Sequence, residues 1–425
     1  MEYRRRMLDD KLDDLFPALA AIAIEGAKGV GKTATASQRV FTVLDLADPN
    51  QRRSAADNYD LVTQVPPPVL VDEWQLVPSV WDRVRQAVDQ DPTGGRFLLT
   101  GSAGIEPGVR IHSGAGRIVS FRLRPMSLVE RGVAQAAVSL RTLLAGERPP
   151  VEGVTDVTLP QYVSEILRSG FPGIRDLPET ARMAQLDGYL GQIVQRELPA
   201  NGAMIRHPTA LKQWLAAYAA ATATDASYTA LLDAATPGEG DKPARQTVAS
   251  YRELLARLFI LDPLDAWQPT FAPLARLTRA SKHHVVDPAL AARLVGVGFD
   301  GLLLGKGDRV VPRPDTNTWL GALFESLATQ SVRVYAEAVG ATTGHLRTGN
   351  TQHEIDLIVE SPERRVVAIE VKLAATATDR DVRHLNWLKD QLGDRVADRV
   401  CLTAGPYAYR RRDGVAVIPL ALLGP

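Results

Sequence analysis

Eight residues near the start of the chain constrain its fold more than any other stretch. Residues 26–33 read Gly-Ala-Lys-Gly-Val-Gly-Lys-Thr and fit the pattern G-x-x-x-x-G-K-[ST] at every position. The apolar residues 19–24 before this loop predict a buried parallel strand, and residues 33–40 after it predict a helix. Glycines let the backbone bring its N–H groups close to phosphate oxygens, and a helix N-terminus favours an anion. The sequence therefore predicts a nucleotide-binding loop between a strand and a helix.

We expect the whole loop to contact the nucleotide. Lys32 would reach the β- and γ-phosphates, and the Thr33 hydroxyl would be a ligand of Mg²⁺. ATP and Mg²⁺ are accordingly the expected cofactors. The residues expected to bind the nucleotide are Gly26, Ala27, Lys28, Gly29, Val30, Gly31, Lys32 and Thr33, together with Thr100 further along the chain.

A second apolar strand is expected within residues 69–74 and delivers two acidic residues, Asp72 and Glu73, at its carboxyl end. In open α/β sheets ligands bind at the carboxyl ends of the strands, so this strand would place both carboxylates at the nucleotide. Asp72 would hold Mg²⁺, and Glu73 would act as the general base that polarises the attacking water.

A third strand, at residues 96–102, also runs into small polar residues. Thr100 or Ser102 would lie between the two catalytic strands and sense the γ-phosphate, although a hydroxyl that caps a loop is the alternative for both. Arg117 follows a glycine-rich loop. It is a candidate to stabilise transition-state charge on the nucleotide of a neighbouring subunit in a homo-oligomer, with a solvated arginine as the alternative.

The bulk composition fits a folded chain of several domains. With 425 residues the chain is too long for one hydrophobic core, and 45% hydrophobic and 23% charged residues are ordinary for a folded protein. Lys and Arg number 49, as do Asp and Glu, which argues against an extended basic surface but leaves a local basic cleft open. Cys401 is the only cysteine, so a reducing, cytoplasmic location is expected. The longest apolar run, residues 18–24, is far short of the ~20 residues that cross a bilayer, so no membrane partner is expected.

The middle of the chain is rich in predicted helices. Residues 161–167, 182–198, 214–221 and 247–259 show helical spacing of apolar residues. The last two, followed by an apolar hairpin formed by residues 259–261 and 282–286, suit a winged helix that would contact DNA or pack against protein. Residues 291–318 are rich in glycine and polar residues and predict a linker.

The last third contains a second constellation of charged residues. Residues 354–360 and 365–372 predict a hairpin that carries Asp356 on one strand and Glu370 and Lys372 on the next. Glu370 and Lys372 are two apart and therefore point to the same face. Glu325 lies on the apolar face of a predicted helix at residues 319–334, which is unusual because an unpaired buried carboxylate is costly.

Together these residues resemble the PD-(D/E)xK nuclease superfamily. The resemblance implies that Glu325, Asp356 and Glu370 would hold one or two Mg²⁺ ions and that Lys372 would orient the attacking water. Asp356, Glu370 and Lys372 would then be catalytic. A surface hairpin with an intrastrand Glu–Lys pair is the alternative.

The N-terminal motifs resemble a prokaryotic family of AAA+-type P-loop ATPases that carry a C-terminal domain of unknown function, number 4143. The motifs follow the family's order: Gly-Ala-Lys-Gly-Val-Gly-Lys-Thr, Leu-Val-Asp-Glu-Trp, Leu-Leu-Thr-Gly-Ser, Gly-Arg-Ile, and Leu-Arg-Pro-Met-Ser-Leu-Val-Glu-Arg at residues 123–131. The resemblance implies that Lys32, Thr33, Asp72 and Glu73 form an ATP site and that Arg117 is an arginine finger. It also implies a helical lid marked by Gly170-Phe171-Pro172 and Arg196-Glu197.

The expected fold is therefore an α/β multidomain chain. It comprises a P-loop AAA+ ATPase core with a three-layer parallel sheet at residues 1–135, a helical lid at 136–208, a winged-helix-like segment at 209–295 and a restriction-endonuclease-like α/β domain at 318–425. The expected function is ATP hydrolysis coupled to a nuclease-like domain that acts on or binds DNA or RNA. The alternative is an ATP-driven switch or scaffold whose inactive nuclease-like domain binds a protein partner.

Overall fold

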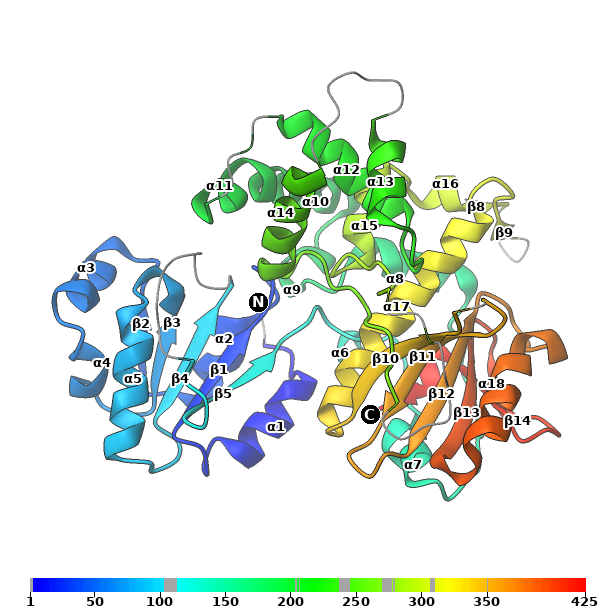
Figure 1. Cartoon of the computed structure of the whole chain (residues 1–425), viewed down its shortest axis with the longest axis horizontal. Coiled ribbons are helices and arrows are strands. Elements are labelled where there is room, and N and C mark those ends of the chain that lie inside the picture. The colour runs from blue at the N-terminus through cyan, green and yellow to red at the C-terminus, as the bar shows by residue number, and fades with distance from the viewer. Residues whose placement is uncertain are drawn as a thin grey trace.

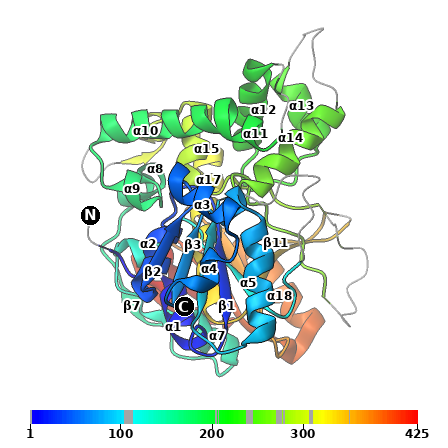
Figure 2. The same cartoon turned by 90° about the vertical axis from the view of Figure 1, so that its left-hand side faces the viewer.

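The computed structural model of the chain describes residues 3–102, 113–202, 205, 207–236, 245–269, 277, 280–305, 310–349 and 351–425. A five-stranded sheet and a seven-stranded sheet lie at opposite sides of the molecule, and a group of helices lies above and between them (Figure 1). Figure 2 shows the N-terminal sheet and its helices from the left-hand side of that view.

The N-terminal sheet is parallel throughout, with the strand order β2-β3-β4-β1-β5. Its strands are β1 (Ala21–Glu25), β2 (Thr42–Asp45), β3 (Val69–Asp72), β4 (Phe97–Gly101) and β5 (Ile118–Arg122). Its helices are α1 (Met7–Leu15), α2 (Lys32–Ala36), α3 (Pro49–Asp57), α4 (Leu61–Gln64) and α5 (Ser79–Gln90). The structure thus confirms the parallel sheet and the strands predicted beside the glycine-rich loop.

Alternate residues of the buried strands face opposite layers of helices. Ala21 and Ala23 of β1 pack in one core with residues of α3, α4 and α5, whereas Ile22 and Ile24 pack in another with α1 and α2. Because both faces are covered, the strands are apolar without alternation, as parallel strands usually are. The three-layer arrangement follows directly from this burial.

The middle of the chain is helical. Its elements are α6 (Leu128–Arg131), α8 (Leu159–Arg168), α9 (Pro172–Arg175), α10 (Glu179–Gln192), a π-helical turn (Ile193–Glu197), α11 (Leu198–Ala200), α12 (Pro208–Ala220), α13 (Tyr228–Ala235) and α14 (Arg245–Arg257). The predicted apolar hairpin is present as two isolated antiparallel bridges, Leu261 with Val285 and Leu264 with Lys282.

The predicted linker at residues 291–318 is wrong in part, because regular elements extend into it. These elements are α15 (Pro288–Val295), α16 (Phe299–Leu302), β8 (Leu303–Leu304) and β9 (Val311–Pro312). The Asp287 side chain caps α15 by accepting a hydrogen bond from the Ala289 amide, and Gly296 ends the helix with a φ of 77°. These capping residues fix a helix in a stretch whose polar composition favours a loop.

The C-terminal part of the chain forms a mixed sheet with the strand order β10-β11-β12-β13-β15-β14-β7. Its strands and helices are α17 (Asn317–Ala338), β10 (Thr342–Arg347), β11 (Glu354–Glu360), β12 (Val366–Lys372), α18 (Asp379–Leu392), β13 (Val396–Thr403), β14 (Tyr407–Arg410), β15 (Ala416–Pro419) and β16 (Leu423–Gly424). The predicted hairpin is confirmed, since β11 and β12 are antiparallel with Leu357 opposite Ile369.

Two short strands from the middle of the chain complete the C-terminal sheets. β7 (Gly153–Val154) pairs with β14, and β6 (Val138–Ser139) pairs with β16, while α7 (Leu140–Ala145) packs against β13. Residues 136–208 are expected to form a helical lid, yet β7 pairs with β14 of the C-terminal sheet, β6 pairs with β16 in a separate two-stranded sheet, and α7 packs against β13. Within the described ranges, the helices are all too short or too polar to cross a membrane.

Candidate functional site

The glycine-rich loop connects β1 to α2 in a conformation that needs its glycines. A Cβ atom on Gly26 would lie 2.2 Å from the Leu123 carbonyl oxygen, so only glycine fits there. Gly31 has a φ of 102° and sits at the N-cap of α2. The predicted strand–loop–helix unit is therefore present, with the loop folded at the carboxyl end of β1.

Lys32 is buried inside the loop, with 5% of its surface exposed. Its ammonium group donates hydrogen bonds to the Gly26 and Ala27 carbonyl oxygens, at 2.9 and 3.0 Å. Burial lowers the pKa of Lys32 to about 8, against the opposing charges of Glu73 and Asp72. The cation is thus held among backbone dipoles at the place where phosphate oxygens would enter.

Thr33, Asp72 and Thr100 meet at the carboxyl edge of the sheet. The Thr33 hydroxyl lies 3.0 and 2.9 Å from the two Asp72 carboxylate oxygens, and the Thr100 hydroxyl also donates to Asp72. β3 and β4 are neighbours, with Asp72 opposite Thr100, so the sheet register itself brings these side chains together. Burial raises the pKa of Asp72 above its usual value, although the two hydroxyl donors oppose the rise.

Glu73 stands beside this group in a strained backbone conformation. Its φ of 53° lies in the left-handed region, which is uncommon for a residue with a side chain and is often found at functional sites. The Ser102 hydroxyl donates to Glu73 Oε2 at 2.9 Å, and the Gln75 amide donates to the same oxygen. The carboxylate is therefore fixed by two donors next to Asp72.

The donor set of this site fits a magnesium nucleotide. A hydroxyl and a carboxylate that converge within 3.0 Å are the oxygen ligands that Mg²⁺ prefers, and Lys32 offers an ammonium group for phosphate oxygens. Thr33 and Asp72 would hold the ion, and Lys32 would bind the β- and γ-phosphates.

Arg117 lies away from this group and pairs within the chain. Its guanidinium contacts the Asp89 carboxylate of α5 at 2.7 Å and donates to the Ala115 carbonyl oxygen. Nearly half of its side-chain surface is exposed. Its role as a finger toward a neighbouring subunit stays a prediction.

The four charged residues singled out in the last third of the chain also come together. Glu325 is supplied by α17, Asp356 by β11, and Glu370 and Lys372 by β12. Lys372 Nζ lies 2.6 Å from Glu370 Oε1 and 3.9 Å from Asp356 Oδ2. Asp356 Oδ2 also accepts a hydrogen bond from the Val371 amide at 2.9 Å.

A further residue, Lys282, occupies the centre of this cluster. Its ammonium group lies 2.8 Å from Glu325 Oε1, 2.9 Å from Asp356 Oδ1 and 3.1 Å from Glu354 Oε1. Although burial favours the neutral amine, the Asp356, Glu325 and Glu354 carboxylates raise the pKa of Lys282 well above its usual value. A permanent cation thus sits among the carboxylates.

The donor set of the C-terminal cluster does not fit a divalent metal ion. In the described part of the chain, no group of three or more His, Cys, Asp or Glu side chains is arranged to hold a metal. The carboxylates expected to be ligands, Glu325 and Asp356, point at Lys282 instead. Burial raises the pKa of Glu370, while the Lys372 ammonium group at 2.6 Å from its Oε1 atom opposes the rise. The Glu370 Oε2 atom is buried and has no hydrogen-bond partner among the described residues.

Comparisons with known families match three parts of the chain. Residues 19–131 match the AAA domain family, residues 159–300 match a domain of unknown function (DUF8612), and residues 320–423 match a domain of unknown function (DUF4143). The first match covers the loop, Asp72, Glu73 and Thr100 described above. Residues 19–131, called the AAA domain below, are thus similar to this family. The match at residues 320–423 confirms the expected C-terminal domain of unknown function, number 4143.

Two curated proteins align with 72% of this chain. It is 26% identical over 316 residues to the uncharacterized proteins Mb2031c of Mycobacterium bovis and Rv2008c of Mycobacterium tuberculosis. The alignments cover 72% of this chain and 62% of each relative, so the chain spans less than two thirds of their length. Among solved structures it is similar to the Walker-type ATPase PABY2304 of Pyrococcus abyssi, with 14% identity and a TM-score of 0.37 over 67% of this chain and 94% of that one.

Sequence reasoning missed several residues that shape the AAA domain site. Arg6 is buried and donates to the Val30 carbonyl oxygen of the loop at 2.8 Å and to Glu130 Oε1 at 3.1 Å. Gln75 positions Glu73. A charged residue such as Arg6, before the first strand, gives no periodic signal. Gln75 lies only two positions after Glu73, and its nearness to that motif is a signal that could have identified it.

The pKa of Lys32 gives the AAA domain a predictable pH dependence. A cation whose pKa is about 8 stays charged below that pH and loses its charge above it. Since phosphates bind the charged form, the Kd for ATP is expected to be constant below pH 8 and to rise about tenfold per pH unit above it. Anisotropy of a fluorescent ATP analogue across this range measures the profile.

The matched control is Lys32→Arg, since arginine keeps its charge in proteins. Its Kd should show no step near pH 8, even if its affinity is lower. An equal step in both proteins would assign the titration to another group.

Proposed function

We propose that the chain hydrolyses ATP with Mg²⁺ and uses the nucleotide state to act on its C-terminal domain. The observation that carries this proposal is the meeting of Lys32, Thr33, Asp72 and Thr100 at one sheet edge, with Glu73 held beside them. This group contains a phosphate-binding cation, two Mg²⁺ ligands and a positioned carboxylate.

Each residue has a defined task in hydrolysis. Lys32 binds phosphate oxygens, and Thr33 and Asp72 hold the ion, with Thr100 fixing the orientation of the Asp72 carboxylate. Mg²⁺, when bound, neutralises charge on the phosphates. Glu73 accepts a hydrogen bond from the attacking water and orients it. Ser102 and Gln75 hold Glu73 in place.

The base and ribose would lie in a cavity of about 280 Å³ beside the loop. The residues that line it come from the N-terminal segment, the loop, α2 with the turn after it, and α9 with the residue after it: Tyr3, Arg4, Arg6, Gly31, Ala34, Thr35, Gln38, Pro172 and Asp176. Helix α9 thus borders this cavity, as part of a lid would. Glu197 of the π-helical turn pairs with Lys28 at 2.9 Å, and Tyr189 donates to the Lys28 carbonyl oxygen. Bound phosphates would compete for Lys28 and so move the lid.

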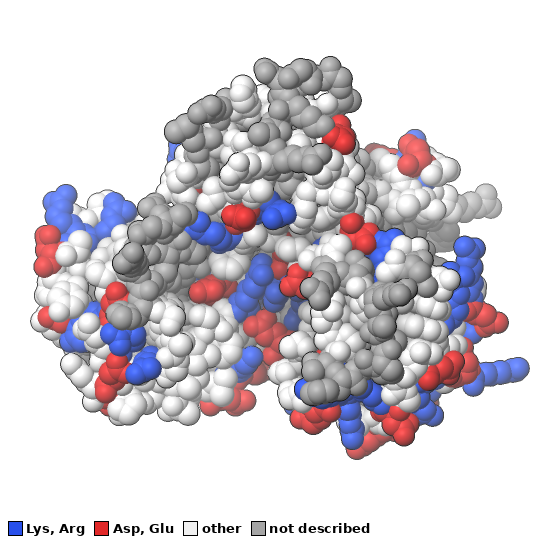
Figure 3. All heavy atoms as spheres, in the orientation of Figure 1, with Lys and Arg blue, Asp and Glu red and all other residues white. Residues whose placement is uncertain are grey.

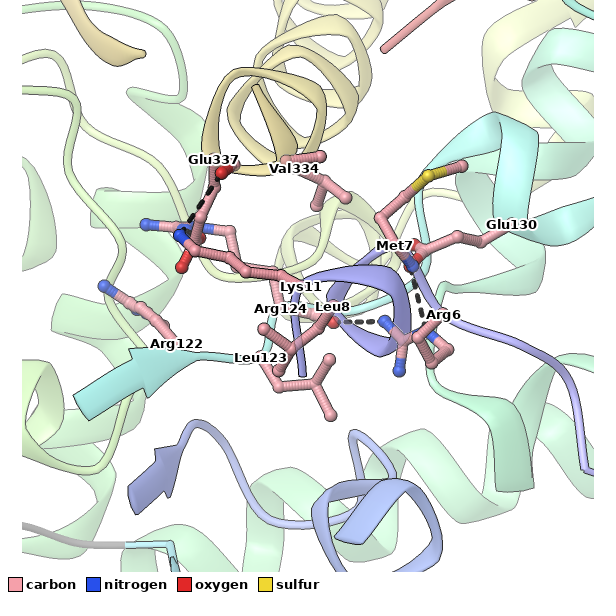
Figure 4. Close-up of a pocket in the computed structure, with 11 residues that line it drawn as sticks. Arg6, Met7, Leu8, Lys11, Arg122, Leu123, Arg124, Glu130, Val334 and Glu337 are labelled. Atoms are coloured by element: carbon pink, nitrogen blue, oxygen red, sulfur yellow. Dashed lines mark hydrogen bonds and ion pairs between the residues drawn. The ribbon is translucent and has the colours of Figure 1, made fainter. Parts of the chain in front are cut away.

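A chain of buried contacts connects the loop to the C-terminal half. Arg6 bridges the Val30 carbonyl oxygen and the Arg124 carbonyl oxygen, at 2.8 and 2.7 Å. The Arg124 side chain pairs with Asp262 at 3.0 Å and with Glu337 of α17 at 3.1 Å. Figure 4 shows Arg6, Arg124 and Glu337 around a small pocket where α1, β5 and α17 meet. A displacement of the loop would therefore be transmitted to α17 through Arg6 and Arg124.

The target of this coupling is the nuclease-like C-terminal domain and the winged-helix-like segment before it. They would bind nucleic acid, or, in the alternative, a protein partner without cleaving it. Lys282 among the carboxylates favours a domain that binds and does not cut. On the face shown in Figure 3, Lys and Arg are interspersed with Asp and Glu, also in the hollow between the two domains. Mixed charge there favours a protein partner over bulk nucleic-acid binding.

Hydrolysis and coupling are tested together on the wild-type chain. We expect phosphate release from ATP that stops when EDTA removes Mg²⁺. A non-hydrolysable ATP analogue should change amide hydrogen exchange in residues 260–264 and 333–338, which carry the contacts to Arg124.

The Lys32→Ala variant is the control, because it should show neither phosphate release nor the exchange change. Absence of Mg²⁺-dependent phosphate release from the wild type would refute the ATPase. Phosphate release without an exchange change at these segments would refute the coupling alone.

A further inference from the structure

The backbone around Lys282 is held firmly outside the C-terminal sheet. Its amide donates to the Leu264 carbonyl oxygen, and the Leu264 amide donates back, both at 2.9 Å. The Lys282 side chain then reaches from this bridge into the C-terminal domain, where only 2% of the residue is exposed. The site that resembles a nuclease centre is thus completed by a residue from a different segment of the chain.

The Lys282 ammonium group donates hydrogen bonds to Glu325 and Asp356 and forms an ion pair with Glu354. An ammonium group has three N–H donors and no acceptor, and three carboxylates lie within 3.1 Å of it. Asp356 has both oxygens engaged, one with Lys282 and the other with the Val371 amide. Each of the three carboxylates thus directs one oxygen at the ammonium group.

A divalent ion in the same place would have to displace this ammonium group. The lysine is tethered by its backbone bridge, so it cannot leave as a free ion would. Removing one partner from a buried ion pair leaves an uncompensated charge, which is strongly unfavourable. The lysine and a metal ion therefore compete for one position.

We infer that Lys282 is the resident cation of the Glu325–Glu354–Asp356 cluster, so that this site binds no divalent metal and the domain does not cleave phosphodiester bonds with one. The cluster instead joins the segment around Lys282 to α17 and β11. This inference concerns the C-terminal domain alone and holds whether or not the AAA domain hydrolyses ATP.

Binding of Mn²⁺ to the full chain without nucleotide tests the inference, with the free ion counted by electron paramagnetic resonance. Wild type and Glu325→Gln should bind the same amount of Mn²⁺, because the intact cluster takes none. Lys282→Met should bind about one further Mn²⁺ ion per chain, since Glu325 Oε1 and Asp356 Oδ1 then lose the cation that donates to them. The double variant Lys282→Met/Asp356→Asn should lose that ion again.

Thermal unfolding gives a second readout in the same proteins. Mn²⁺ should raise the Tm of Lys282→Met and leave that of the wild type unchanged. The inference is overturned if the wild type binds a Mn²⁺ ion that Glu325→Gln loses, or cuts DNA or RNA with Mn²⁺ in a manner that Asp356→Asn abolishes. It is also overturned if folded Lys282→Met gains no ion. If Lys282→Met does not fold, the comparison of wild type with Glu325→Gln decides.

Discussion

Replacing Glu73 by glutamine should lower ATP turnover by about a hundredfold or more, while ATP affinity changes little. The amide is nearly isosteric, so the contacts with Ser102 and Gln75 can persist, but it cannot polarise the attacking water. Phosphate release under single-turnover conditions and anisotropy of a labelled ATP analogue measure the two quantities separately.

Lys32→Ala is the companion variant, and it should lose affinity as well as turnover because it removes the phosphate-binding cation. Lys212→Ala, on the exposed side of α12, is the matched control and should behave as wild type. Undiminished turnover in Glu73→Gln would remove the general-base role, and unchanged affinity in Lys32→Ala would place the phosphates elsewhere.

Replacing Asp262 by asparagine should lower the free energy of unfolding by about 3–5 kcal/mol. The Asp262 carboxylate is buried and lies 3.0 Å from each of three guanidinium groups, those of Arg122, Arg124 and Arg333. These arginines hold the pKa of Asp262 far below its usual value in spite of burial. Without the negative charge, three cations would face one another in a buried site.

Urea unfolding monitored by tryptophan fluorescence measures this loss. Asp187→Asn is the control, because Asp187 pairs with a single arginine, Arg293, and half of its side chain is exposed. Such a surface pair contributes about 0–1 kcal/mol. Equal losses of unfolding free energy in the two variants would show that the Asp262 cluster stabilises the fold no more than a surface ion pair does.

The residues of the candidate nucleotide site could be predicted because their pattern is encoded locally. The spacing of residues 26–33 fixes the loop, and an apolar run that ends in Asp72 and Glu73 indicates a strand end. Parallel strands place their carboxyl ends at one edge, so Thr100 at the end of the next strand is expected at the same edge as Asp72. The hairpin of Asp356 and Glu370 was predictable for a similar reason, since two apolar runs on either side of a short turn indicate adjacent strands.

The residues that sequence reasoning missed are placed by contacts between residues far apart in sequence. Lys282 lies 74 residues before Asp356 and belongs to a stretch whose pattern indicates only a packed strand. Arg6 contacts Glu130 across 124 residues. Composition and periodicity report which face of an element is buried, but they do not report which distant charge compensates a buried carboxylate. That limit explains why the metal ligands predicted for the C-terminal cluster do not fit a metal.

The pairing of β7 with β14 has a consequence for synthesis on the ribosome. Arg410 donates to the Pro149 carbonyl oxygen, 261 residues earlier in the chain. All five strands of the AAA sheet lie within the first 122 residues, so the sheet can fold as soon as these residues emerge from the ribosome. Synthesis proceeds at about 5–20 residues per second, so β14 and β16, the partners of residues 138–154, are made well over ten seconds later. During that interval their hydrogen-bonding edges are open, so the nascent chain is most vulnerable to aggregation after its first domain has already folded.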